Sequence, residues 1–253
     1  MANFIEVSLV DYTGALSPNA AHYAAAVLAF TKNTRLEMSP MGLAKQLERS
    51  YDDLLGELSY MANTIPSSWE FVDLTFSIQN VTRACAQQIT RTRWSPVESD
   101  MFGSYAMQSQ RVTDVSAMGF RIPPNSGSLI GSKIDLASQK IMATYATLIR
   151  EGAEPEDARS ILPMNIQCNL LAKYNLRTFV EIVKARQSLR AQDEFQEVAK
   201  LMLEAVRGVY PWVDMFLINK QDAAIKIIED VAIKLPTEDK RALAKAADLI
   251  RKG

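Results

Sequence analysis

Histidine is almost absent from this chain of 253 residues, because His22 is the only one. It lies in the alanine-rich run NAAHYAAAV, which is typical of a helix face, and we interpret it as structural. A Ser/His/Asp triad would have to use it, and zinc sites with two histidine ligands are excluded. The motif G-x-G-x-x-G and the phosphate-binding P-loop are missing too. We therefore expect any chemistry to come from a bound cofactor.

Cysteine is also scarce, with only Cys85 and Cys168, which are too few and too far apart to form a metal cage or a disulfide framework. The net charge of −1 predicts no surface for a nucleic acid polymer. The start of the chain does not resemble a signal peptide, and no apolar run reaches the roughly 18 residues needed to span a bilayer. These features predict a cytoplasmic protein with no membrane partner and no metal.

The first half of the sequence predicts both strands and helices. Residues 3–11 read as a strand, and the alanine-rich stretch 17–32 reads as a helix with Ser17 as N-cap and Pro18 in the first turn. A second helix is expected over 40–62. The segment WEFVDLTFSIQ alternates β-branched and aromatic residues and predicts a strand, and NVTRACAQQITRTR after it has helical periodicity.

The second half predicts mostly helix. Residues 94–132, rich in Ser, Pro, Gly and Met, predict loops with one or two short strands. Helices are expected over 133–151, after Pro155, over 164–190 and 192–208, and twice more before the C-terminus. Strands early and helices late predict an α+β fold, which we assign to one domain over 1–253.

Two arginine-bearing clusters carry the functional signal. The first is QQITRTRWS followed by SYAMQSQRV, and the second is EPEDARSILP followed by NLRTFVEIVKARQSLRAQDEF. Each arginine alone is more often a solvated surface residue than a ligand contact. Together, however, they match the ordered motifs of one known family.

In order and spacing these segments resemble the flavin-dependent thymidylate synthases. That family's signature R-H-R-x-x-S-x-N-E-x-S-x-R-Y is similar to Arg91-Thr92-Arg93, an extra loop, and then 104–112. SWEFVDLTFSI resembles its P-F-E-H-x-x-F-T-F strand. GAEPEDARSILP followed by NLRTFVEIVKARQSLRAQDEF resembles its helical half, with its N-A-R-S-L and A-Q-W-E-I stretches. The resemblance is strongest over 65–212. It implies the family's α+β fold and a homotetramer that holds FAD and a pyrimidine nucleoside monophosphate between subunits.

The resemblance also assigns site residues. The residues implied for FAD are Ser67, Arg91, Thr92, Arg93, Asn175, Arg177 and Glu181. The residues implied for the nucleotide are Gln88, Ser109, Gln110, Arg111, Arg159 and Arg186. Arg111 would bind chiefly the phosphate. Arg186 would be catalytic, because a fixed cation beside the pyrimidine stabilises negative charge on the ring and makes its 5-carbon nucleophilic without a cysteine adduct. Methylene-tetrahydrofolate and NADPH are the implied co-substrates.

Several site positions depart from the family pattern. Family histidines are replaced by Ile65, Thr92 and Arg190, its Asn-Glu pair by Ala106-Met107, and its final tyrosine by Val112. Residues 94–103 form an insertion that is either a lid or a surface loop. Three interpretations stay open: a divergent thymidylate synthase acting on dUMP; a specialised methylase or hydroxymethylase of a secondary-metabolite or phage pathway, acting for example on UMP; and a non-catalytic homologue that binds flavin or nucleotide.

Overall fold

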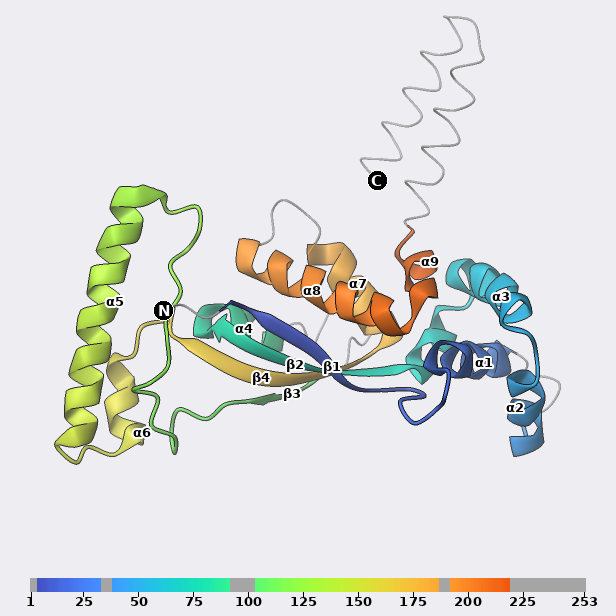
Figure 1. Ribbon diagram of the computed structural model, residues 1–253, viewed down its shortest axis with the longest axis horizontal. Helices are drawn as coiled ribbons and strands as arrows, with labels where there is room; N and C mark the ends of the chain where they lie inside the picture. The colour runs from blue at the N-terminus through green and yellow to red at the C-terminus, as the bar shows by residue number, and fades with distance from the viewer. Residues whose placement is uncertain (1–3, 33–37, 92–102, 187–191, 219–253) are drawn as a thin grey trace, which may run out of the picture.

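A four-stranded antiparallel sheet forms the centre of the chain (Figure 1). The computed structural model describes residues 4–32, 38–91, 103–186 and 192–218. Strands β1 (Glu6–Tyr12), β2 (Asp73–Thr82), β3 (Gly103–Met107) and β4 (Gln167–Asn175) follow the order β1-β2-β4-β3. With helices around this sheet, the predicted α+β fold is confirmed.

Helices cover one face of the sheet. Alternate residues of β2, namely Leu74, Phe76 and Ile78, are fully buried, as the two-residue period of a strand requires. Above them lie α4 (Arg83–Arg91), α7 (Leu176–Arg186) and α8 (Asp193–Val209) (Figure 1). Within the described ranges no helix lies on the opposite face, where Lys173 and Asp73 form a cross-strand ion pair at 2.8 Å.

Further helices lie beyond the two ends of the sheet (Figure 1). At one end are α1 (Ala20–Lys32), α2 (Pro40–Leu47), α3 (Tyr51–Thr64), the 3-10 turns η1 (Pro66–Phe71) and η3 (Pro211–Val213), and α9 (Asp214–Leu217). At the other end are α5 (Gly127–Arg150), α6 (Pro155–Ala158) and the 3-10 turn η2 (Arg159–Ile161). This second end has its own small core, which includes Met142 and Tyr145. None of the helices in the described ranges combines the length and apolar character needed to cross a bilayer.

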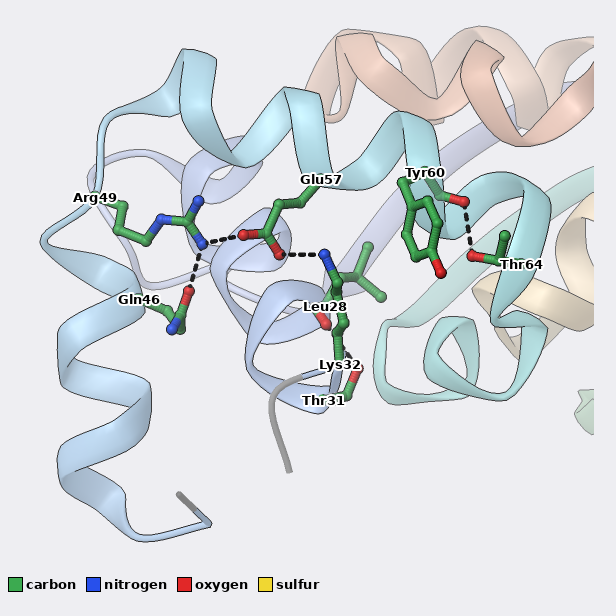
Figure 2. A network of polar contacts seen from close by, with 8 residues as sticks. All are labelled: Leu28, Thr31, Lys32, Gln46, Arg49, Glu57, Tyr60 and Thr64. Atoms are coloured by element: carbon green, nitrogen blue, oxygen red, sulfur yellow. Dashed lines mark hydrogen bonds and ion pairs between the residues drawn. The ribbon is translucent and has the colours of Figure 1, made fainter. Parts of the chain in front are cut away.

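A polar network fastens the three N-terminal helices to one another (Figure 2). Glu57 of α3 accepts hydrogen bonds from Lys32 of α1 at 3.3 Å and from Arg49, which follows α2, at 2.6 Å. Arg49 also donates to Gln46 at 2.8 Å, and the Lys32 ammonium lies 4.9 Å from the centroid of the Tyr60 ring. These groups are partly exposed, so the network fixes geometry more than it adds stability.

Two helix predictions in the first half were wrong in detail. The first helix begins at Ala20 rather than at Ser17, because the Asn19 side chain accepts the His22 N–H at 3.0 Å and caps it. The helix expected over 40–62 is two helices, since Ser50 caps the N-terminus of α3 by accepting the Asp53 N–H. Trp69 lies in η1, so the predicted strand WEFVDLTFSIQ begins only at Asp73.

The largest error concerns 164–190, which was predicted as one long helix. Residues Gln167–Asn175 form β4, where Leu170, Ala172 and Tyr174 are buried alternately, and only Leu176–Arg186 is helical. The helix expected over 133–151 begins earlier, at Gly127, while α8 matches its prediction within one residue. The short strand expected within 94–132 is β3. The two last predicted helices lie mainly in 219–253, outside the described residues.

Candidate functional site

Arg111 and Arg159, predicted for the nucleotide, meet at one acidic residue. The Arg111 Nε lies 3.6 Å from the Glu156 carboxylate, and the Arg159 Nε donates to the Glu156 carbonyl oxygen at 3.2 Å. Glu156 belongs to α6, whose first turn begins at Pro155. Both arginines are exposed, so a ligand can reach them from solvent. The fold therefore joins two segments that are far apart in the sequence into one basic corner.

The segment before Arg111 extends the edge of the sheet. The Gln108 N–H donates to the Asn169 carbonyl at 2.9 Å, continuing the pairing of β3 with β4. The Ser109 hydroxyl accepts the Arg111 N–H at 3.2 Å and is exposed beside it. Gln110 points inward instead, and within the described ranges neither its Nε2 nor the Gln108 Oε1 has a hydrogen-bond partner. Ser109 and Arg111 are thus the accessible members of this segment.

A second group forms where β4 passes into α7. Arg177 donates to Glu70 of η1 at 2.6 Å, and Ser67 lies exposed on the same 3-10 turn. Asn175 caps α7 by accepting the Thr178 N–H at 2.8 Å. Glu181 is exposed on α7 four residues after Arg177, so both are on one helix face. The structure therefore gathers these residues predicted for FAD at one corner. Glu70, within the SWEF motif, was missed as a member.

Arg186 ends α7 and faces α8. Its guanidinium carbon lies 4.3 Å from the centroid of the Phe195 ring, in the geometry of a cation–π contact. Its Nε is buried and has no hydrogen-bond partner in the part of the chain that the structure describes. It lines a cavity of about 500 Å³ between α7 and α8, together with Asp193, Glu197, Lys200, Arg207 and others. Arg186 is thus in contact with an aromatic ring at the wall of a cavity.

Gln88 and Arg91 occupy neighbouring positions on α4, three residues apart and therefore on one side of the helix. Gln88 is half-buried and Arg91 is exposed. The other predicted members of the R-x-R element, Thr92 and Arg93, lie outside the described residues, as does Arg190. The 94–103 insertion lies outside them too, apart from Gly103, which begins β3.

The corner of Arg111 and the corner of Arg177 are at opposite ends of β4. Gln108 meets β4 at Asn169, and Asn175 ends the strand six residues later. At about 3.3 Å per residue, this separates the two corners by roughly 20 Å. Arg186 belongs to neither corner, since its described contacts are with α8. One chain thus presents the predicted residues as separate groups.

Sequence reasoning missed a buried polar link between α4 and α8. Glu194, in the first turn of α8, accepts two hydrogen bonds from Thr82 at 2.7 Å each. Beside it Arg121 is ion-paired with Glu197. The signal was available, because Glu194 belongs to the AQDEF stretch that supported the family resemblance. It was not singled out because the residue types alone do not show that this carboxylate is buried.

The two cysteines are unsuited to nucleophilic chemistry. Both are buried, and burial raises the pKa of Cys168 to about 11. Burial raises the pKa of Cys85 even further, with the neighbouring Glu194 carboxylate adding to the effect. Because the thiolate is the reactive form, both side chains are inert near neutral pH.

Comparison with known proteins identifies the family of the chain. Residues 8–212 match the family described as thymidylate synthase complementing protein. The chain belongs to this family. Similar relatives include flavin-dependent thymidylate synthases from Geobacter sulfurreducens, 31% identical over 57% of this chain and 60% of the relative, and from Saccharolobus solfataricus, 30% identical over 54% and 50%. The protein of that name from Clostridium tetani is 27% identical over 82% of this chain and 84% of its own length. The match thus spans about half to three fifths of the first two relatives.

The family implies a flavin, and the corner around Arg177 fits one. Ser67 offers a hydroxyl, Asn175 an amide and Arg177 a guanidinium, which together can donate hydrogen bonds to a diphosphate. Arg177 is paired with Glu70 in this structure, and the pair is partly exposed, with 29% of the Arg177 side chain accessible. An exposed ion pair of this kind adds little stability, so an anionic ligand can displace it at low cost.

Proposed function

We propose that the chain is a flavin-dependent methyltransferase that alkylates the 5-carbon of a uridine-type nucleoside monophosphate, dUMP or UMP. Methylene-tetrahydrofolate would donate the carbon, and NADPH would reduce FAD. The observation that supports this best is the meeting of Arg111 and Arg159 beside Ser109, in a chain that belongs to the thymidylate synthase complementing protein family.

The corner of Arg111 and Arg159 suits a phosphate monoester. Two guanidinium groups and the Ser109 hydroxyl can all donate hydrogen bonds to its oxygens. Glu156 neutralises Arg111 through a pair in which both side chains are more than half exposed. A phosphate dianion carries more charge than this carboxylate and accepts bidentate bonds, so it replaces Glu156 with a net gain.

Arg186 is the group we assign to the pyrimidine. Because the contact with Phe195 restrains the guanidinium, its position is set before the substrate arrives. A fixed cation at the edge of the ring stabilises the charge that develops as the 5-carbon becomes nucleophilic. Ser67, Asn175 and Arg177 would hold FAD, which in its reduced form would supply the hydride. No thiol is required, in keeping with the raised pKa values of the buried cysteines.

We further propose that the active sites are shared between the copies of a homotetramer. The separation of the two corners along β4 supports this, since one copy can offer Arg177 to a flavin while another offers Arg111 to the nucleotide. The face of the sheet on which the described residues place no helix leaves room for such an assembly (Figure 1). Sedimentation of the FAD-loaded protein tests this, and a strict monomer contradicts it.

A second candidate is a specialised methylase or hydroxymethylase of pyrimidine nucleotides. It is favoured by Met107, which stands where the family pattern has a carboxylate. Its sulfur accepts a hydrogen bond from Arg83 at 3.4 Å, so this arginine meets a neutral group there. A changed charge beside the reacting groups gives a reason to expect a changed substrate or product.

One turnover experiment separates these possibilities. The purified protein is supplied with FAD, methylene-tetrahydrofolate and NADPH and is given dUMP, UMP or dCMP in turn, and products are identified by mass. Gain of one methyl group on dUMP or UMP is the expected result. Gain of a hydroxymethyl group, or strict use of UMP, indicates the specialised enzyme. Binding of FAD and nucleotide without any product indicates a non-catalytic homologue and contradicts the proposal.

A further inference from the structure

A buried carboxylate connects α8 to the beginning of α4. The Glu194 residue is only 6% exposed, and its two oxygens divide their roles. Oε1 accepts the Thr82 N–H and Oε2 accepts the Thr82 O–H, both at 2.7 Å. A buried charge persists only where such bonds replace water, so this contact is specific rather than incidental.

Thr82 is the residue on which α4 begins. It ends β2, and its hydroxyl oxygen accepts the Cys85 N–H at 3.0 Å, which caps the first turn of α4. The partial positive charge of this helix end lies toward the Glu194 carboxylate, which stabilises it. A helix of nine residues is marginal by itself, so its place depends on such contacts.

Of the two elements joined by Glu194, α4 carries residues of the proposed site, and α8 contacts Arg186 through Phe195. Helix α4 carries Gln88 and Arg91, assigned to the nucleotide and to FAD. Glu194 lies eight positions after Arg186, in the first turn of the next helix. Two neighbouring contacts anchor the same turn, since Asp193 accepts a hydrogen bond from Asn125 and Glu197 pairs with Arg121.

We propose that Glu194 is a positioning residue that sets the place of Gln88 and Arg91 through Thr82. In this role it acts through Thr82 and requires no contact of its own with either ligand. By fixing the beginning of α4, it holds these two side chains at the site. This inference rests on the proposed function, because Gln88 and Arg91 matter only if the chain binds nucleotide and flavin.

Glu194→Gln is the main test, because it keeps the size of the side chain and removes its charge. An amide has one acceptor oxygen, so at least one of the two bonds from Thr82 is lost. We expect the Kd for dUMP or UMP and the Kd for FAD to rise together by about tenfold or more, the loss typical of a bond to a charged group. Glu204→Gln is the matched control, because Glu204 is exposed on the same helix and pairs only loosely with Lys200, at 3.9 Å.

Substitutions of Thr82 show whether Glu194 acts through it. Thr82→Val removes the hydroxyl and should weaken both ligands, while Thr82→Ser keeps the hydroxyl and should restore both affinities. The double variant Glu194→Gln/Thr82→Val should raise each Kd by less than the product of the two single-variant fold-changes, since both substitutions break the same contact. If Glu194→Gln does not fold, the pair of Thr82 variants carries the test.

A merely structural role has a different result. In that case Glu194→Gln lowers the unfolding midpoint, while the folded protein keeps both Kd values within about twofold, and the proposal is overturned. If the fold-changes in Kd of the two single variants multiply fully in the double variant, Glu194 does not act through Thr82, and that part of the proposal is overturned. A wild-type protein that binds neither FAD nor nucleotide contradicts the proposed function itself, which distinguishes that failure from the failure of Glu194 alone.

Discussion

Arg186→Lys tests the proposed chemistry most directly. The substitution keeps the positive charge but removes the planar fork and the stacking on Phe195, where the guanidinium carbon lies 4.3 Å from the ring centroid. Loss of one preorganised electrostatic group typically costs about 2.7–4 kcal/mol in the transition state, which lowers turnover by about 10²–10³. FAD content should not change, because the Arg177 corner lies at the far end of β4 and of α7 from these contacts.

The contribution of the aromatic support can be separated from that of the charge. A cation–π contact contributes about 0.5–2 kcal/mol. Phe195→Leu should therefore lower turnover by about 2–30-fold, less than Arg186→Lys. Because Phe195 is only 1% exposed, the smaller side chain also destabilises the fold, so the unfolding midpoint must be measured beside the rate.

The assay is turnover at saturating nucleotide, with bound FAD measured by absorbance. Arg207→Lys is the matched control, since Arg207 lines the same cavity but forms an ion pair with Asp214 at 2.8 Å. It should leave turnover unchanged. Full activity of Arg186→Lys, together with loss of activity in Cys85→Ser or Cys168→Ser, would refute the mechanism.

Three further predictions concern the remaining groups. Arg111→Ala should weaken nucleotide binding by about 1.5–3 kcal/mol in a titration and leave nucleoside binding unchanged, because a charged hydrogen bond to phosphate is lost. Glu156→Gln should strengthen nucleotide binding. Equal losses for nucleoside and nucleotide would show that Arg111 does not bind the phosphate. Arg177→Ala should lower FAD retention measured by absorbance, whereas Glu70→Gln should raise it by freeing the guanidinium; unchanged retention in both contradicts that corner. Cys168 keeps its thiol proton up to a pKa of about 11 in the fold, while the unfolded chain loses it near pH 8.5–9. The free energy of unfolding should therefore fall as pH rises through this window, by up to about 3 kcal/mol, and less in Cys168→Ala by denaturant titration.

The sequence predicted the sheet only in part, and β4 shows why. Residues 167–175 contain Leu, Ala and Lys, which favour helices, and Asn, which is rare in strands. No glycine or proline separates this segment from the helix α7. The strand forms because it pairs with β2 on one side and β3 on the other, which is a tertiary contact that no local window contains. The helix break at Ser50 was missed for the opposite reason, since its local capping signal was overlooked.

Residues of the candidate site could be named from the sequence only where the motifs of the family resemblance contain them. Arg111 and Arg159 were assigned from motifs, and the fold brings them to one corner. The sequence did not predict the pairing of Glu156 with Arg111, the pairing of Glu70 with Arg177 or the buried role of Glu194. Each depends on which acidic residue the fold places beside the arginine or the helix end concerned. Acidic residues are common throughout the sequence, so the sequence does not indicate which one this is.

The length of β4 has a genetic consequence. If Arg111 and Arg177 serve different active sites of one assembly, a chain that lacks either residue still contributes the other to a neighbour. Co-expression of Arg111→Ala and Arg177→Ala chains, each inactive alone, should then restore activity in about a quarter of the sites, because random mixing pairs two intact halves that often. A site built within one chain gives no such complementation, since every copy carries one of the two lesions.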